Sequence, residues 1–240
     1  LVVWDAQTGT NVLASGDLTG IVPTNSICDW PAITADGRFV AFMSTATNLV
    51  TNSLSGEFHL YLRDLQTGTT SLLNVDTNGI GLDVGPLSFL RLTADGLFGP
   101  FEAPDGSLVS GDNNRANDVF VRDLTLNRTG LISARHPALL SATPNGQSTL
   151  YPMSVNGDGR YIAFASEAND LVSNDTNGFR DVFVRDLWMG TIVRISVAAG
   201  GVQSDDASRV NDMSADGRYV VHVFAHGRRQ IFLERGRPEI

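Results

Sequence analysis

The stretch at residues 156–190 contains the phrase that the rest of the chain repeats: NGDGRYIAF, then ASEANDLVSNDTNGFRD, then VFVRDLWMG. An Asp-Gly pair precedes an apolar run, a long loop rich in Asp and Asn follows, and a second apolar run ends in Asp. The Asp-Gly pair predicts a β-hairpin, because glycine accepts the positive φ that a primed turn demands. The two apolar runs are therefore expected to be strands on either side of a long polar loop.

Two landmarks of this phrase recur at a spacing of about sixty residues. The Asp-Gly pair begins at Asp36, Asp95, Asp158 and Asp216, and the strand-ending Asp recurs as Asp5, Asp64, Asp123 and Asp186. The first set is spaced by 59, 63 and 58 residues, and the second by 59, 59 and 63. Two independent landmarks with nearly the same spacing are hard to produce by chance, so the chain is an array of one supersecondary unit.

Each unit reads as four short strands: one before the Asp-Gly turn, one after it, one ending in the second Asp, and a β-branched run beyond. The turn that this second Asp opens closes on Gly9, Gly68, Asn127 or Gly190, as a type I turn followed by a bulge residue requires. The Asp side chain is expected to accept backbone N–H groups inside its own turn. Four-stranded units repeated radially predict an all-β fold, a β-propeller of four-stranded antiparallel blades.

The repeats place complete blades at residues 30–74, 90–133 and 154–196, with a partial blade and linker at 1–29 and a partial blade at 210–240. In the second repeat Gly99 and Pro100 stand where the others continue a strand, which indicates an irregular, edge-like strand. The terminal strands exceed one blade by a strand. They either close a small four-bladed ring with a spare strand or belong to a larger ring, and we favour the larger ring.

The pattern DGR, Y or F, V or I, A, F … NDLV … DTNG … DVFVRDL resembles the bacterial WD40-like repeats of the TolB-type propeller. The resemblance covers nearly the whole chain and implies the β-propeller fold. Because many unrelated functions use this fold, the resemblance says little about function.

Composition narrows the class of partner. The chain has 240 residues, a net charge of −9 and a pI near 4.7, which argues against nucleic acid or an anionic membrane as the partner. Cys28 is the only cysteine, so neither an intrachain disulfide nor a thiolate metal site is expected. No run approaches the roughly 18 apolar residues that span a bilayer. The chain begins at Leu1 without a leader, as a processed product or an excerpt would.

Two loops carry oxygen ligands with one shared spacing and are the candidate metal sites. The residues are Asp112, Asn114 and Asp118 in one loop, and Asp175, Asn177 and Asp181 in the other, with Asp170 as a further ligand for the second. Oxygen ligands at alternate positions on a glycine-assisted turn, closed by a later carboxylate, suit Ca²⁺. The alternative is that Asp, Asn and Gly simply form turns. Neither loop has the bidentate Glu of an EF-hand.

Other polar and aromatic residues are given structural roles. We expect His222 to be a core or channel residue rather than a catalytic base. Arg63, Arg122 and Arg185 recur beside the strand-ending Asp residues, which most simply indicates a ladder of structural ion pairs rather than an anion site. Trp188 breaks the repeat pattern, and we expect it to fill a gap between blades rather than to stack on a sugar ring.

The function predicted from these features is a non-catalytic binding or scaffold module, secreted or periplasmic and stabilised by Ca²⁺, with a protein or glycan partner on an end face of the propeller. Open ring edges also predict self-association. One alternative is a glycan-active hydrolase or lyase, which would need Asp side chains converging at the ring's mouth. Another is a structural subunit of a cell-surface assembly.

Overall fold

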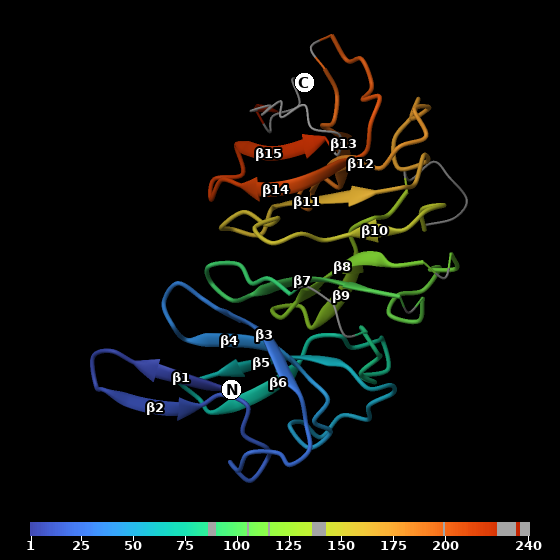
Figure 1. Cartoon of the computed structure of the whole chain (residues 1–240). Helices are drawn as coiled ribbons and strands as arrows, with labels where there is room; N and C mark the ends of the chain where they lie inside the picture. Colours follow the sequence, from blue (N-terminus) through green and yellow to red (C-terminus); the bar gives the residue numbers. More distant parts are fainter. Residues whose placement is uncertain are drawn as a thin grey trace.

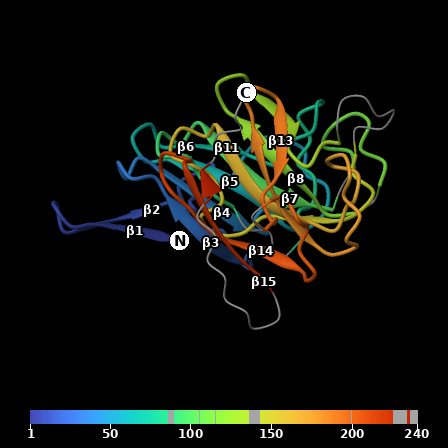
Figure 2. The same ribbon diagram turned by 90° about the horizontal axis from the view of Figure 1, so that it is seen from above.

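The computed structural model describes residues 1–85, 90–104, 106–114, 116–135, 143–198, 200–224 and 234–235. Its strands form five antiparallel sheets that follow one another in chain order (Figure 1). Sheet 1 pairs β1 (Val2–Asp5) with β2 (Thr10–Leu13), and this hairpin projects away from the other sheets (Figure 2). The all-β architecture of antiparallel blades that the repeats predict is confirmed.

Sheets 2 and 4 have four strands each, and sheets 3 and 5 have three. Sheet 2 has the order β3 (Cys28–Ile33), β4 (Phe39–Ser44), β5 (His59–Asp64), β6 (Thr69–Leu72). Sheet 3 has β7 (Phe98–Ala103), β8 (Asp118–Asp123), β9 (Arg128–Leu131). Sheet 4 has β10 (Ser148–Thr149), β11 (Tyr161–Ser166), β12 (Asp181–Asp186), β13 (Thr191–Arg194). Sheet 5 has β14 (Ser208–Met213), β15 (Tyr219–Phe224), β16 (Glu234–Arg235); the rest of the partial blade predicted at 210–240, residues 225–233 and 236–240, lies outside the described residues.

The Asp-Gly pairs do form hairpins, but the turn class differs from the prediction. A type I′ turn needs positive φ at both central residues. Only the glycines have it here, for example Gly37 at 74° and Gly217 at 68°. Asp36 Oδ1 instead accepts hydrogen bonds from the Thr34 hydroxyl (2.6 Å) and the Arg38 amide (3.0 Å). The carboxylate therefore stabilises a turn in which glycine alone is left-handed.

In sheets 2 and 5 the first strand contains a bulge, which the sequence does not predict. The register of β3 against β4 shifts between Asp29 and Ala32, and that of β14 against β15 shifts between Val210 and Asp212. In sheet 3 the first strand is reduced to a single bridge from Leu90 to Phe101. Pro100 has no N–H to extend that pairing, although its carbonyl accepts from the Arg91 amide at 3.3 Å.

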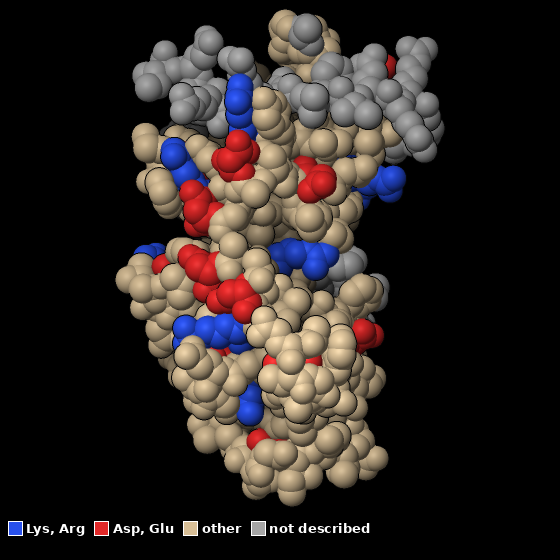
Figure 3. All heavy atoms as spheres, turned by 90° about the vertical axis from the view of Figure 1, so that its left-hand side faces the viewer, with Lys and Arg blue, Asp and Glu red and all other residues tan. Residues whose placement is uncertain are grey.

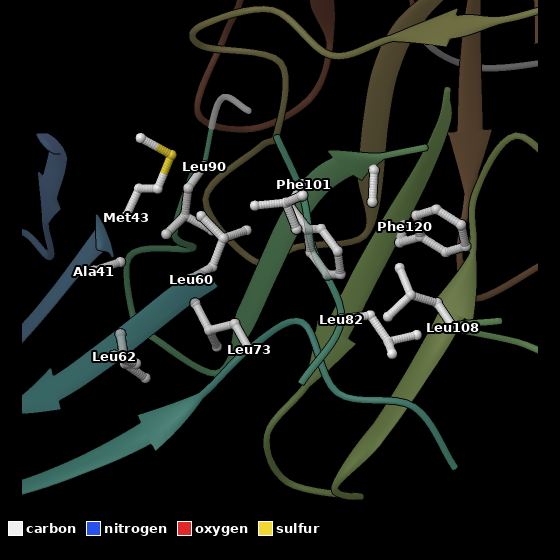
Figure 4. Packing of buried hydrophobic residues seen from close by; sticks show 12 residues of the cluster. Ala41, Met43, Leu60, Leu62, Leu73, Leu82, Leu90, Phe101, Leu108 and Phe120 are labelled. Atoms are coloured by element: carbon white, nitrogen blue, oxygen red, sulfur yellow. The ribbon is translucent and has the colours of Figure 1, made fainter. Parts of the chain in front are cut away.

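The core lies between consecutive sheets. Between sheets 2 and 3, buried side chains from β4, β5 and β7 meet, among them Met43, Leu60 and Phe101 (Figure 4). Within three of the sheets a buried aromatic on the second strand stacks on one from the third. The pairs are Phe42–Tyr61, Phe101–Phe120 and Phe164–Phe183, with ring centroids 5.7–5.8 Å apart. The repeated strands of sheets 2, 3 and 4 are thus apolar on both faces because each of these sheets packs against a neighbour on both sides.

The Asp-Gly turn of one sheet also packs on the preceding sheet. A Cβ at Gly217 would lie 2.5 Å from the ring of Tyr161, and one at Gly96 would lie 2.5 Å from the ring of Phe39. The Gly157 amide donates to the Ala215 carbonyl at 2.8 Å across the same interface. These contacts fix how far each sheet stands from the next.

No helix with the length and hydropathy of a membrane span occurs in the part of the chain that the structure describes.

Candidate functional site

Each of the two predicted metal loops forms a polar cluster, and the two clusters have equivalent hydrogen bonds. Asn177 Nδ2 donates to Asp181 Oδ2 at 2.9 Å, and its Oδ1 accepts the Phe179 amide at 3.1 Å. Asn177 Nδ2 also donates to the Ser204 carbonyl of the next unit at 3.1 Å. Since the Asn carbonyl serves its own turn and its NH₂ group faces the carboxylate, this side chain braces the loop. These contacts favour the turn-forming role.

The matching cluster in sheet 3 has the same contacts. Asn114 Nδ2 donates to Asp118 Oδ2 at 2.8 Å and to the Pro144 carbonyl at 3.0 Å, and the Ser133 hydroxyl donates to Asp118 Oδ1 at 2.6 Å. Asp118 is fully buried. Burial raises the pKa of Asp118 to about 7, hydrogen bonds from Ser133 and Asn114 oppose the rise, and the charge of Asp112 adds to it.

A guanidinium group lies between the carboxylates of the second loop. Arg194 Nη1 is 2.8 Å from Asp175 Oδ1 and 3.6 Å from Asp181 Oδ2. This cation belongs to the end of β13, where the matching position on β9 is Leu131. The second loop therefore has its positive charge from the chain itself.

Asp170 makes its contacts elsewhere. It forms an ion pair with Arg135 at 3.0 Å and accepts the Asn145 amide at 3.1 Å. Among the described residues, no group of three or more His, Cys, Asp or Glu side chains is arranged to hold a metal ion. The sequence thus located a repeated structural cluster, and titration with Ca²⁺ decides whether it also binds a metal.

The predicted Arg ladder is wrong in its partners. Arg38 and Arg160, from the Asp-Gly turns, pair with the strand-ending residues Asp64 and Asp186 at 2.8 and 2.7 Å. The Arg38 hydrogen bonds hold the pKa of Asp64 well below its usual range. Arg63 instead donates to the Thr70 hydroxyl at 3.0 Å. The third residue of each DGR motif was the signal for the true pairs, because it directly precedes the second-strand residue that pairs with the strand-ending Asp.

Two other expectations have different outcomes. His222 is fully buried and takes the place that a stacked phenylalanine has in the other sheets, as expected for a core residue. The prediction that Trp188 fills a gap between blades is wrong, because its side chain is 67% exposed. The Arg160 guanidinium lies 4.9 Å from its ring centroid, so the Trp covers an ion pair at the surface.

A groove of about 650 Å³ lies between the outer strands of sheets 2 and 3, β6 and β9. Its walls include Ser71 and Val75 on one side and Arg122 and Arg128 on the other. The Thr129 hydroxyl donates to the Val75 carbonyl at 2.8 Å and ties the two walls together. The floor includes Leu108, which belongs to the core between these sheets (Figure 4). No sequence motif marks this groove, because it arises from the spacing of two sheets.

The charged side chains that line the groove differ in the hydrogen bonds that they already form. Asp76 Oδ1 accepts the Asn78 and Ile80 amides, each at 2.8 Å, so its carboxylate is engaged in its own turn. Arg122 is 6% exposed and donates to the hydroxyl of Thr129 at 3.2 Å and to the side chain of Asn127. Burial lowers the pKa of Arg122. The lining therefore contains two cations and one anion, and the anion is already hydrogen-bonded.

Acidic and basic side chains are interspersed on the face of the molecule in Figure 3. With two cations and one anion in its lining, the groove has a net positive charge in a chain whose net charge is −9.

No protein-family model matches this sequence, and no curated protein matches it. Among solved structures, the chain is similar to TolB from Acinetobacter baumannii, with 17% identity and a TM-score of 0.45, over 97% of this chain and 44% of that one. It is also similar to the β-propeller domain of the trilobed protease from Pyrococcus furiosus, with 12% identity and a TM-score of 0.48, over 88% of this chain and 53% of that one.

An oligogalacturonate lyase in complex with manganese is similar at 16% identity and a TM-score of 0.50, over 97% of this chain and 56% of that one. The chain thus shows structural similarity to TolB and other β-propeller domains at low sequence identity. At such identity the likeness shows the fold alone, and the chain spans about half the length of these structures.

Proposed function

We propose that this chain is a non-catalytic binding module of a β-propeller, and that its ligand lies in the groove between β6 and β9. The observation that carries the proposal is the groove itself: about 650 Å³, of a size that suits a small ligand, with polar side chains above an apolar floor. A secreted or periplasmic location fits the acidic composition and the likeness to TolB, and it is part of the proposal.

We prefer a binding function to a glycan-active enzyme because the repeated carboxylates are already hydrogen-bonded within their own turns. Asp5, Asp64, Asp123 and Asp186 each accept backbone amides within their own turns, for example Trp188 to Asp186 at 2.9 Å. Asp36, Asp95, Asp158 and Asp216 do the same in the hairpins. Carboxylates committed to turns in every repeat support a structural role for them.

The proposal is tested by filling the groove. Ser71 is exposed on the groove wall, so Ser71→Trp blocks the groove without entering the core. Ser53→Trp, at an exposed serine outside the groove lining, is the matched control. Both variants and the parent chain are screened by thermal shift against neutral sugars, acidic sugars and short peptides.

The proposal predicts at least one probe that raises the Tm of the parent and of Ser53→Trp but not of Ser71→Trp. Equal shifts in all three proteins, or no shift in the parent with any probe, would overturn it.

A further inference from the structure

We propose that the groove between β6 and β9 binds an oxyanion, the carboxylate or phosphate group of a small polar ligand, with the Arg122 guanidinium as its anchor. This inference rests on the proposed function, since it names the chemical group that the same groove would take.

The first argument is the state of the guanidinium. It carries five N–H donors, and hydrogen bonds to described residues use one on Nη1 and one on Nη2. Its Nε is buried and has no hydrogen bond to a described residue. None of the ion pairs between described residues includes Arg122. The charge of the neighbouring Asp123 favours the charged guanidinium but forms no ion pair with it. A buried cation without a directly paired anion is costly, and a bound oxyanion would supply that partner.

The second argument is how this chain uses arginine elsewhere. Four guanidinium groups among the described residues form ion pairs with carboxylates, for example Arg38 with Asp64 and Arg194 with Asp175. Arg122 lies on the same strand position as Arg63, one repeat later, and both donate to a threonine on the next strand. Arg122 differs because it lines the groove, while Arg63 does not.

The third argument is the fit of the surroundings. Thr129 and Asn127 hold the two Nη atoms, so the planar group is preorganised for a bidentate contact with an oxyanion. Arg128 adds a second cation at the exposed rim, and the hydroxyls of Ser71 and Ser110 lie in the same lining. In a chain of net charge −9, the surrounding field does not favour anions, so binding depends on these local donors.

The test is calorimetric titration with sodium phosphate and with sodium acetate at pH 7, at constant ionic strength set with sodium chloride. We expect saturable binding with a Kd on the order of millimolar or tighter for at least one of the two. Tighter binding of phosphate would indicate a natural ligand with a phosphate group, and tighter binding of acetate would indicate one with a carboxylate group. Arg122→Gln should weaken that binding at least about tenfold, and Arg122→Lys should weaken it less, since it keeps the charge but loses the fork.

Arg63→Gln is the matched control, because it removes the same charge and the same bond to threonine one repeat earlier, and its Kd should stay within about twofold of the parent. Equal loss in both glutamine variants, or no saturable binding of either salt to the parent, would overturn the proposal. If circular dichroism shows that Arg122→Gln does not fold, the titration is repeated with Arg128→Gln, at the rim of the groove. Its expected loss is about two- to fivefold, and an unchanged Kd would contradict the proposal.

The two proposals fail separately. If a neutral probe binds the parent and not Ser71→Trp while neither salt binds, the groove is a binding site and the oxyanion assignment is wrong. If nothing binds in either experiment, both are wrong.

Discussion

At some Asp-Gly turns glycine is required both for its positive φ and because the preceding sheet leaves no space for a Cβ. Gly217 has a φ of 68°, and a Cβ there would lie 2.5 Å from the Tyr161 ring of the preceding sheet. Gly37 has a φ of 74° but no atom within 4 Å of an added Cβ. We expect Gly37→Ala to cost about 1 kcal/mol of unfolding free energy from backbone strain, and Gly217→Ala to cost about 2–4 kcal/mol because the steric conflict adds to that strain.

Urea denaturation of both variants measures the difference. Equal losses of stability would show that the turn does not pack on the preceding sheet.

Glu102 makes stability depend on pH. This carboxyl is 7% exposed on β7 and accepts the Leu150 amide at 3.2 Å. Burial raises the pKa of Glu102 from 4.5 to about 7. Between these values the folded chain binds more protons than the unfolded chain, so the contribution of Glu102 to stability is full below about pH 4.5 and is lost as the pH rises to about 7.

We therefore expect Glu102→Gln to stabilise the chain at pH 8 by up to about 3 kcal/mol and to change it little at pH 4.5. The measurement is urea denaturation at both pH values, with Glu57→Gln at an exposed site as the control. Asp118 also titrates near pH 7, so some pH dependence should persist in the variant. A pH-independent effect of Glu102→Gln would contradict the assignment.

At the scale of the element, the strands and turns that local sequence motifs determine were predictable from the sequence. The second strand of sheets 2, 4 and 5 follows its Asp-Gly turn as predicted, because the turn and an apolar run mark it. The five-residue turns were predicted correctly, and Asn127 has the expected positive φ of 52°. The bulges of the first strands were missed, since they depend on packing against the neighbouring sheet. Arg194 was missed as the partner of Asp175 because Asp175 lies in the loop before β12, whereas Arg194 is the last residue of β13.

The loop of Asp175 allows a direct test of calcium. Arg194 already supplies a positive charge to Asp175 and Asp181, and the Asn177 carbonyl serves the Phe179 amide. We therefore expect no heat and no change in Tm when Ca²⁺ is titrated into chelator-treated protein. In Arg194→Met, which leaves the two carboxylates without that charge, Ca²⁺ should bind better than in the parent chain. Tight calcium binding by the parent would show that the guanidinium gives way to the metal.

At the scale of the whole molecule, the β1–β2 hairpin has an exposed apolar face at Val2 and Trp4, and the loop after it adds further exposed apolar side chains. Val2, Trp4, Ile21 and Val22 are each at least 57% exposed. No other sheet of described residues covers β1 and β2 beyond their contact with sheet 2. We expect the isolated chain to associate with a second copy of itself through this face, since exposed apolar patches of sheets drive association.

Light scattering across a concentration series measures this, and Trp4→Glu should lower the apparent mass. The matched control is Trp188→Glu, an equally exposed tryptophan at 67% on a different sheet, which should leave the mass unchanged. A monomer at every concentration would contradict the prediction.

The overall arrangement was predictable because it follows from the period, whereas the groove was not, because it depends on the distance between two sheets. Crystallographic determination of the chain tests the central claim most directly. We predict sheets set side by side in chain order, with the Gly217 turn against the Tyr161 ring and the Arg122 guanidinium lining an open groove. Helices between the two landmarks, or parallel strands stacked as rungs in a column, would contradict it.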